Sequence, residues 1–134
     1  MPCFNTVYNS YQKWYIGNDV RSILLADEDV ASQVGVHVYP LVAPENTDGD
    51  FIIYSRQKYS KSNTKGGVYE DECLLAVIAV SDNYDNSVAL AAKIDNALTG
   101  QHNIEGTRID LYLQDSTEEF TENKFIQTLL FQVK

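Results

Sequence analysis

The chain has 134 residues, of which 44% are hydrophobic and 22% are charged, and its formal charge is −9. This length and composition indicate one domain that can bury about two thirds of its unfolded surface. No apolar run approaches the ~18 residues of a membrane-spanning helix, and the acidic balance disfavours binding to nucleic-acid phosphates or to an anionic membrane.

The acidic residues are concentrated in the second half of the chain. Residues 1–66 contain six basic and seven acidic side chains, whereas residues 67–134 contain four and twelve. Solubility alone would account for an acidic surface; the sharper alternative is a surface that meets a basic partner or must not retain nucleic acid. Cys3 and Cys73 are too few for a disulfide framework, and no secretory signal is evident, so we expect a reduced, intracellular setting.

Residues 1–17 are predicted to be an aromatic extension of a single domain over residues 18–134. Its aromatic residues recur at helical spacing and favour one helix face, which Gly17 would interrupt. They are Phe4, Tyr8, Tyr11 and Tyr15. Asn18 or Asp19 can cap the next helix, and Asp27 can cap a short one that ends at Gly35.

Three strands are expected next. Residues 36–39 form a short strand closed by Pro40, and a loop over residues 41–50 leads to a second strand over residues 51–59. Residues 60–67 are polar and glycine-rich, which is typical of a hairpin tip. In the third strand, residues 68–80, the part from Cys73 to Val80 is so apolar that we expect it to be covered on both sheet faces or nearly so.

A helix from Tyr84 to Leu98 follows, capped by Ser81, Asp82 or Asn83 and ended near Gly100. Its apolar face comprises Leu90, Ala91, Ile94, Ala97 and Leu98.

Residues 107–114 alternate as a strand, residues 115–123 are read as an acidic loop, and residues 124–133 form the last strand. The predicted order is α-β-β-β-α-β-β. It indicates an α+β fold with a mixed or antiparallel sheet of about five strands and two main helices packed on one face.

Length predicts that part of the first hairpin overhangs the body. Residues 68–80 would span about 43 Å when extended, whereas the helix over residues 84–98 is only about 22 Å long. We expect the polar halves, residues 56–61 and 66–72, to project as an arm; the alternative is that a bulge bends the strands back.

No pattern of catalytic or metal-binding residues stands out. His37 and His102 lie on different elements, and the spacings typical of zinc, calcium or nucleotide sites are absent or incomplete. Cys73 is expected to be a core residue, because nothing nearby in sequence would stabilise a thiolate. We therefore expect neither enzymatic activity nor a cofactor or metal.

Charged surfaces are the remaining candidates for function. A basic tip and separate acidic patches suit a head-to-tail contact between subunits, although ordinary solvated charge would look the same. The candidate interface residues are Arg56, Lys58, Lys61 and Lys65 on the arm, Glu70, Asp71 and Glu72 on its return strand, and Asp115, Glu118, Glu119 and Glu122 in the acidic loop.

Short motifs resemble a family of small phage proteins. Those in the first half are Leu24-Leu25-Ala26-Asp27, Val34-Gly35, Val38-Tyr39-Pro40, Ala43-Pro44 and Ile52-Ile53-Tyr54. The later counterparts are the apolar strand over residues 74–80, the helix over residues 86–98 and Leu130-Phe131-Gln132-Val133. Over roughly residues 18–134 the chain resembles the tail-completion, or tail-to-head joining, proteins of long-tailed phages. It departs from the family at two positions. The family often has an arginine where this chain has His37, and it often has a proline where this chain has Asp50.

The resemblance implies a structural subunit of a tail terminator. Such subunits form a ring, commonly a hexamer, that caps the tail tube at its head-proximal end and meets the head connector. The implied partners are other copies of the chain, the tail tube protein and the connector protein. The implied location is the virion, after assembly in the bacterial cytoplasm. The alternative is an acidic binding module, for example an inhibitor, that docks on a basic protein.

Overall fold

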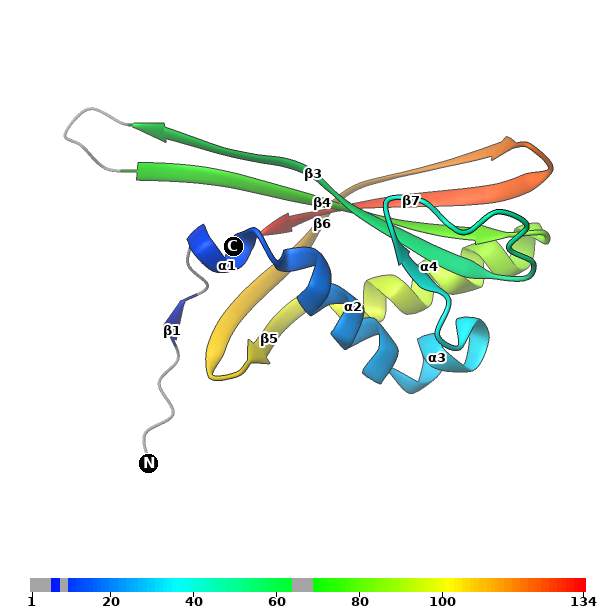
Figure 1. Cartoon of the computed structure of the whole chain (residues 1–134), viewed down its shortest axis with the longest axis horizontal. Helices are drawn as coiled ribbons and strands as arrows, with labels where there is room; N and C mark the ends of the chain where they lie inside the picture. Colours follow the sequence, from blue (N-terminus) through cyan, green and yellow to red (C-terminus); the bar gives the residue numbers. More distant parts are fainter. Residues whose placement is uncertain (1–5, 8–9, 64–68) are drawn as a thin grey trace.

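The computed structural model describes residues 6–7, 10–63 and 69–134 (Figure 1). Seven strands form one mixed sheet in the order β1-β6-β7-β4-β3-β2, with β5 also beside β6. The strands are β1 (Thr6–Val7), β2 (Val38–Pro40), β3 (Phe51–Asn63), β4 (Tyr69–Ser81), β5 (Gly100–Ile104), β6 (Thr107–Thr121) and β7 (Lys124–Val133). The helices are α1 (Ser10–Lys13), α2 (Ile16–Ala26), α3 (Glu28–Val34) and α4 (Tyr84–Leu98). The pairs β1–β6 and β2–β3 are parallel, and the other pairs are antiparallel.

The helices cover one face of this sheet, as predicted for the α+β class (Figure 1). Alternate residues of β4 point toward them, because successive strand side chains face opposite sides. The helices contribute fully buried side chains to the same core. Its main members are Ile16, Val20, Leu24, Val30, Leu75, Val77, Leu90, Ile94, Leu98, Ile109, Leu111 and Phe131.

Two helix starts follow the predicted capping. The Asp27 carboxylate accepts a hydrogen bond from the Val30 amide at 3.0 Å, and the Asn83 side chain accepts one from the Asn86 amide at 3.0 Å. The predicted interruption at Gly17 is wrong, because α2 begins at Ile16 and runs through Gly17. Glycine fits this helix because an added Cβ would lie 2.9 Å from the Tyr54 ring.

The aromatic repeat of residues 1–17 does not form the expected long helix. α1 is a single turn, and β1 precedes it beside β6. Tyr11 and Tyr15 are exposed, whereas Phe4 and Tyr8 lie outside the described residues. Strands β1 and β5 were not predicted. Both are short, and neither has an apolar alternation long enough to be recognised.

The predicted acidic loop over residues 115–123 is wrong. β6 continues to Thr121 and pairs with β7 as far as Lys124, and Glu122 and Asn123 make the turn with φ of 52° and 62°. Both faces of this part of β6 are exposed, so it lacks the apolar alternation that identifies a strand. Its pairing with the apolar strand β7 keeps it extended.

Both long hairpins carry a register shift. One lies between Arg56 and Lys58 in β3 and the other between Leu113 and Asp115 in β6, so Gln57 and Gln114 are extra residues. Such bulges bend a strand and increase its twist.

The expectation that β4 is covered on both faces or nearly so holds for Cys73–Val80. Leu75, Val77 and Ala79 face the helices and are buried, and on the opposite face Ala76 and Val80 are buried whereas Leu74 and Ile78 are partly exposed. No described helix lies over that opposite face, which we call the outer face (Figure 1).

Candidate assembly surfaces

The first surface is a projecting hairpin. β7 pairs with β4 only as far as Cys73, opposite Val133, so within the described part of the chain residues 60–63 and 69–72 pair only with each other. We call these residues the arm. Figure 1 shows the β3–β4 hairpin extending past the helices. The predicted overhang therefore exists, but it begins beyond Arg56 rather than at it.

A brace from α1 holds the base of the arm. Lys13, only 8% exposed, forms an ion pair with Asp71 at 2.7 Å, and the Tyr59 hydroxyl donates a hydrogen bond to the same carboxylate at 3.1 Å. The Arg56 guanidinium lies 4.4 Å from the centre of the Trp14 ring and donates a hydrogen bond to the Trp14 carbonyl at 3.0 Å. The Trp14 ring also packs edge-on against Tyr59. No sequence motif signals this brace, because its partners are far apart along the chain.

The brace changes the titration of two groups. Partial burial alone would raise the pKa of Asp71, but the hydrogen bond and charge of Lys13, assisted by Tyr59 and Lys61, lower it overall. Burial raises the pKa of the Cys73 thiol to about 11, although Lys13 and Arg56 oppose that shift. Cys73 is therefore an unreactive core thiol at neutral pH, in agreement with its predicted role.

The other charged side chains of the β3–β4 hairpin that are described are open to solvent. Lys58 pairs with Glu72 at 2.7 Å, and both side chains are exposed, so this bridge contributes little to stability. The Lys61 amine lies 5.8 Å from the Tyr59 ring centre. Lys65 lies outside the described residues, and Glu70 is described only by its backbone.

The second surface is the hairpin formed by residues 115–121 of β6 with residues 124–130 of β7, which we call the acidic hairpin. Glu118 accepts hydrogen bonds from the Tyr84 hydroxyl and the Gln127 amide, each at 3.0 Å. The hydrogen bond to Glu118 and the charge of that carboxylate raise the pKa of the Tyr84 hydroxyl. The remaining predicted carboxylates of this hairpin are exposed; they are Asp115, Glu119 and Glu122.

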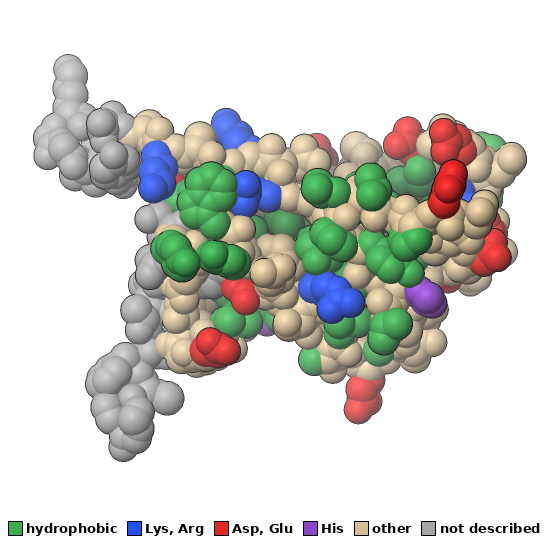
Figure 2. Space-filling view, in the orientation of Figure 1, with side chains coloured by type: hydrophobic (Ala, Val, Ile, Leu, Met, Phe, Trp, Pro, Cys, Tyr) green, Lys and Arg blue, Asp and Glu red, His purple; other side chains and the backbone are tan. Residues whose placement is uncertain are grey.

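The two charged surfaces lie at opposite ends of the molecule. Figure 2 shows Asp and Glu side chains gathered at the end where the acidic hairpin lies, whereas Lys and Arg side chains lie toward the arm. The structure therefore separates the basic and acidic candidate residues, with Asp71 and Glu72 on the basic side as partners of Lys13 and Lys58.

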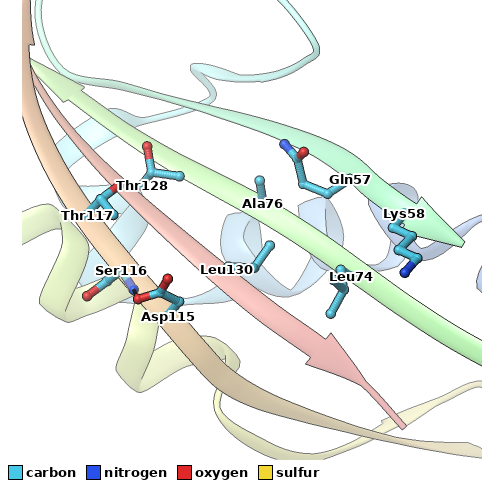
Figure 3. Close-up of a pocket in the computed structure, with 9 residues that line it drawn as sticks. All are labelled: Gln57, Lys58, Leu74, Ala76, Asp115, Ser116, Thr117, Thr128 and Leu130. Carbon is cyan, nitrogen blue, oxygen red and sulfur yellow. Dashed lines mark hydrogen bonds between the residues drawn. The ribbon is translucent and has the colours of Figure 1, made fainter.

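A groove crosses the outer face between these ends (Figure 3). It has a volume of about 460 Å³ and an apolar floor formed by Leu74, Ala76 and Leu130. Lys58 lies on its β3 side and Asp115 on its β6 side. Sequence reasoning missed the groove, although the unbroken apolar run in β4 was a signal for a second covered face.

The described residues contain no group of three or more His, Cys, Asp and Glu side chains that could hold a metal ion. His37 contacts the Tyr39 hydroxyl and His102 contacts the Leu98 carbonyl, so the histidines lie apart on different elements. No helix in the described part of the chain is long and apolar enough to cross a membrane.

No family model and no curated protein matches the chain. Among solved structures, a chain of the virion of a native gene transfer agent particle matches with a TM-score of 0.66. The match covers 85% of this chain and 89% of that chain, and the sequences are 19% identical. The two chains therefore share a fold over most of their lengths.

Proposed function

We propose that the chain is a structural protein of a phage or prophage virion. In this role it caps the tail tube at its head-proximal end, as a ring of copies, and joins the tube to the head connector. The observation that carries the proposal is the fold shared with a virion chain over 85% of this chain and 89% of the other. The resemblance of residues 18–134 to tail-completion proteins supports the proposed position at the head-proximal end of the tail.

The two charged surfaces support assembly with other copies of the chain. The basic residues of β3, which are Arg56, Lys58 and Lys61, and the acidic hairpin lie at opposite ends and allow a head-to-tail contact, which closes into a ring when the rotation permits. Because the contact needs only charge and shape complementarity, the proposed role requires no cofactor and no catalytic group.

The acidic balance also fits this role. DNA that passes through a ring must not bind to it, and a chain with a formal charge of −9 repels phosphates. A ring whose lumen is lined with lysine and arginine would contradict this part of the proposal.

Deletion of the gene in a particle-producing strain tests the function. We expect separate heads and tails by electron microscopy and their joining when the gene is restored. A tagged copy should label the head-proximal end of the tail. Normal particles from the deletion strain, with the protein absent, would overturn the proposal.

The exposed acidic hairpin also supports a second candidate, an acidic module that docks on a basic protein. Its four predicted carboxylates would face such a partner. Fractionation separates the two candidates, because a virion subunit co-sediments with particles whereas a docking module stays in the soluble fraction with its partner. Portal, head-completion and major tail genes beside this gene would favour the virion role.

A further inference from the structure

The sheet has two long edges that no described strand covers. β2 borders β3 only as far as Tyr54, and β5 borders β6 only as far as Leu111. Beyond these points each strand has a described neighbour on one side only, β4 for β3 and β7 for β6. An extended edge of this kind is a template for pairing with another chain.

The two edges match in length. The uncovered parts, residues 55–63 of β3 and residues 112–121 of β6, each span about 30 Å at the rise of an extended strand. Both belong to the hairpins that extend from the helix-covered body (Figure 1).

The edges are also opposite in charge on each sheet face. On the outer face, Lys58 stands opposite Leu74 in β4, and Glu119 stands opposite Ile126 in β7. On the helix face, Lys61 stands opposite Asp71 and Glu118 stands opposite Gln127. If β3 and β6 from two copies lie side by side with their helices on the same face, a register that pairs Lys58 with Glu119 on the outer face places Lys61 opposite Ser116 and diagonal to Glu118 on the helix face.

The strand directions allow this pairing. Three successive antiparallel pairs separate β3 from β6, so the two edge strands run in opposite directions within one sheet. A rotation that keeps the strand direction therefore places β6 of one copy antiparallel to β3 of the next. Opposite charges on paired strands stabilise this arrangement, whereas β3 beside β3 or β6 beside β6 would place like charges together.

We infer that a second copy of this chain adds its β6 edge to the β3 edge of the first, so that one sheet continues across the subunit boundary. The inference rests on the self-assembly in the proposed function and specifies the surfaces that carry it. The contact is heterologous, because each copy offers a different edge to each neighbour.

Disulfide trapping tests the pairing in particles. In a Cys3→Ser background, one copy carries Lys58→Cys and another carries Glu119→Cys, because cross-strand partners approach closely enough for a disulfide. We expect a covalent dimer on non-reducing gels only when both variants are expressed together. Lys61→Cys with Ser116→Cys, direct partners on the helix face in the same register, tests the other face, and Lys58→Cys with Ser32→Cys, on the exposed side of α3, is the matched control.

Each outcome of the cross-linking experiment has one interpretation. A dimer from Lys58→Cys alone would indicate β3 beside β3 and overturn the inference. Failure of both edge pairs to cross-link in particles that contain the protein would overturn edge pairing and leave the proposed function intact. Absence of the wild-type protein from particles would overturn the proposed function together with the inference.

Discussion

A contact with a residue far away in the sequence explains why glycine is favoured at position 17. Alanine is a better helix former than glycine by about 1 kcal/mol, so local preference would favour Gly17→Ala in α2. The new Cβ would lie 2.9 Å from a Tyr54 ring carbon, and Tyr54 is only 6% exposed and cannot easily move.

We expect Gly17→Ala to destabilise the protein by about 1–3 kcal/mol, the usual range for overpacking. Urea denaturation checks this value. In a Tyr54→Leu background the ring is absent, so the cost of Gly17→Ala should shrink or reverse. An equal cost in both backgrounds would show that the ring is not the cause.

Asp71 should make the free energy of unfolding depend on pH in the acid range. Its pKa is lower in the folded protein than its ordinary value of 3.8, so the folded state binds the proton more weakly than the unfolded state. Its contribution is complete above the ordinary pKa and is lost as the pH falls through the lower, folded value. We expect the stability difference between wild type and Asp71→Asn to be largest near neutral pH and to shrink in acid. A constant difference in denaturation series across pH would contradict this.

At the scale of elements, the sequence predicts most accurately where local signals are strong. α4 and α3 follow from apolar spacing and from the caps Asn83 and Asp27. The distal half of β6 could not be recognised, because its side chains are exposed on both faces and only the pairing with β7 makes it a strand. β1 and β5 also depend on their neighbours in the sheet, which a local reading cannot supply.

The α1 brace should order the arm. Trp14→Ala removes a cation–π contact with Arg56 and an edge contact with Tyr59, together about 1–2 kcal/mol. We expect faster amide hydrogen exchange in residues 60–62 and 71–72. Tyr11→Ala is the matched control, because Tyr11 lies in α1, just before Trp14 in the chain, and packs on Tyr15 instead. Equal exchange in both variants would show that Trp14 does not hold the arm.

At the scale of the whole molecule, the charged candidate residues were predictable but their arrangement was not. Composition and spacing identified the lysines and carboxylates of both hairpins. The brace, the groove and the two uncovered edges depend on which strands become neighbours, and that information appears only in the assembled sheet. Lys65, also a candidate, lies outside the described residues.

Charge reversal should weaken self-assembly without unfolding the chain. We expect Lys58→Glu with Lys61→Glu to reduce the assembled fraction in sedimentation and in particles, because two acidic edges then meet. Adding Glu118→Lys and Glu119→Lys to the same chain restores opposite charges and should restore assembly.

Lys93→Glu with Lys134→Glu is the control, since it changes the net charge equally and alters no residue of the two uncovered edges. An equal loss of assembly in this control would show that net charge, rather than the charges of Lys58 and Lys61, causes the effect.

The extra residues Gln57 and Gln114 have a consequence for copy number. Removing either one leaves every other cross-strand pair of its hairpin in place but takes away the local bend. In a closed assembly, adjacent subunits are related by a fixed rotation angle. A subunit with a flatter sheet would make that angle smaller, so more subunits would be needed to close the ring. Deletion of Gln57 should therefore produce larger closed assemblies with unchanged contacts, which native mass spectrometry would count. In the proposed ring, the size of the central opening would then be set by one glutamine rather than by the strength of any contact.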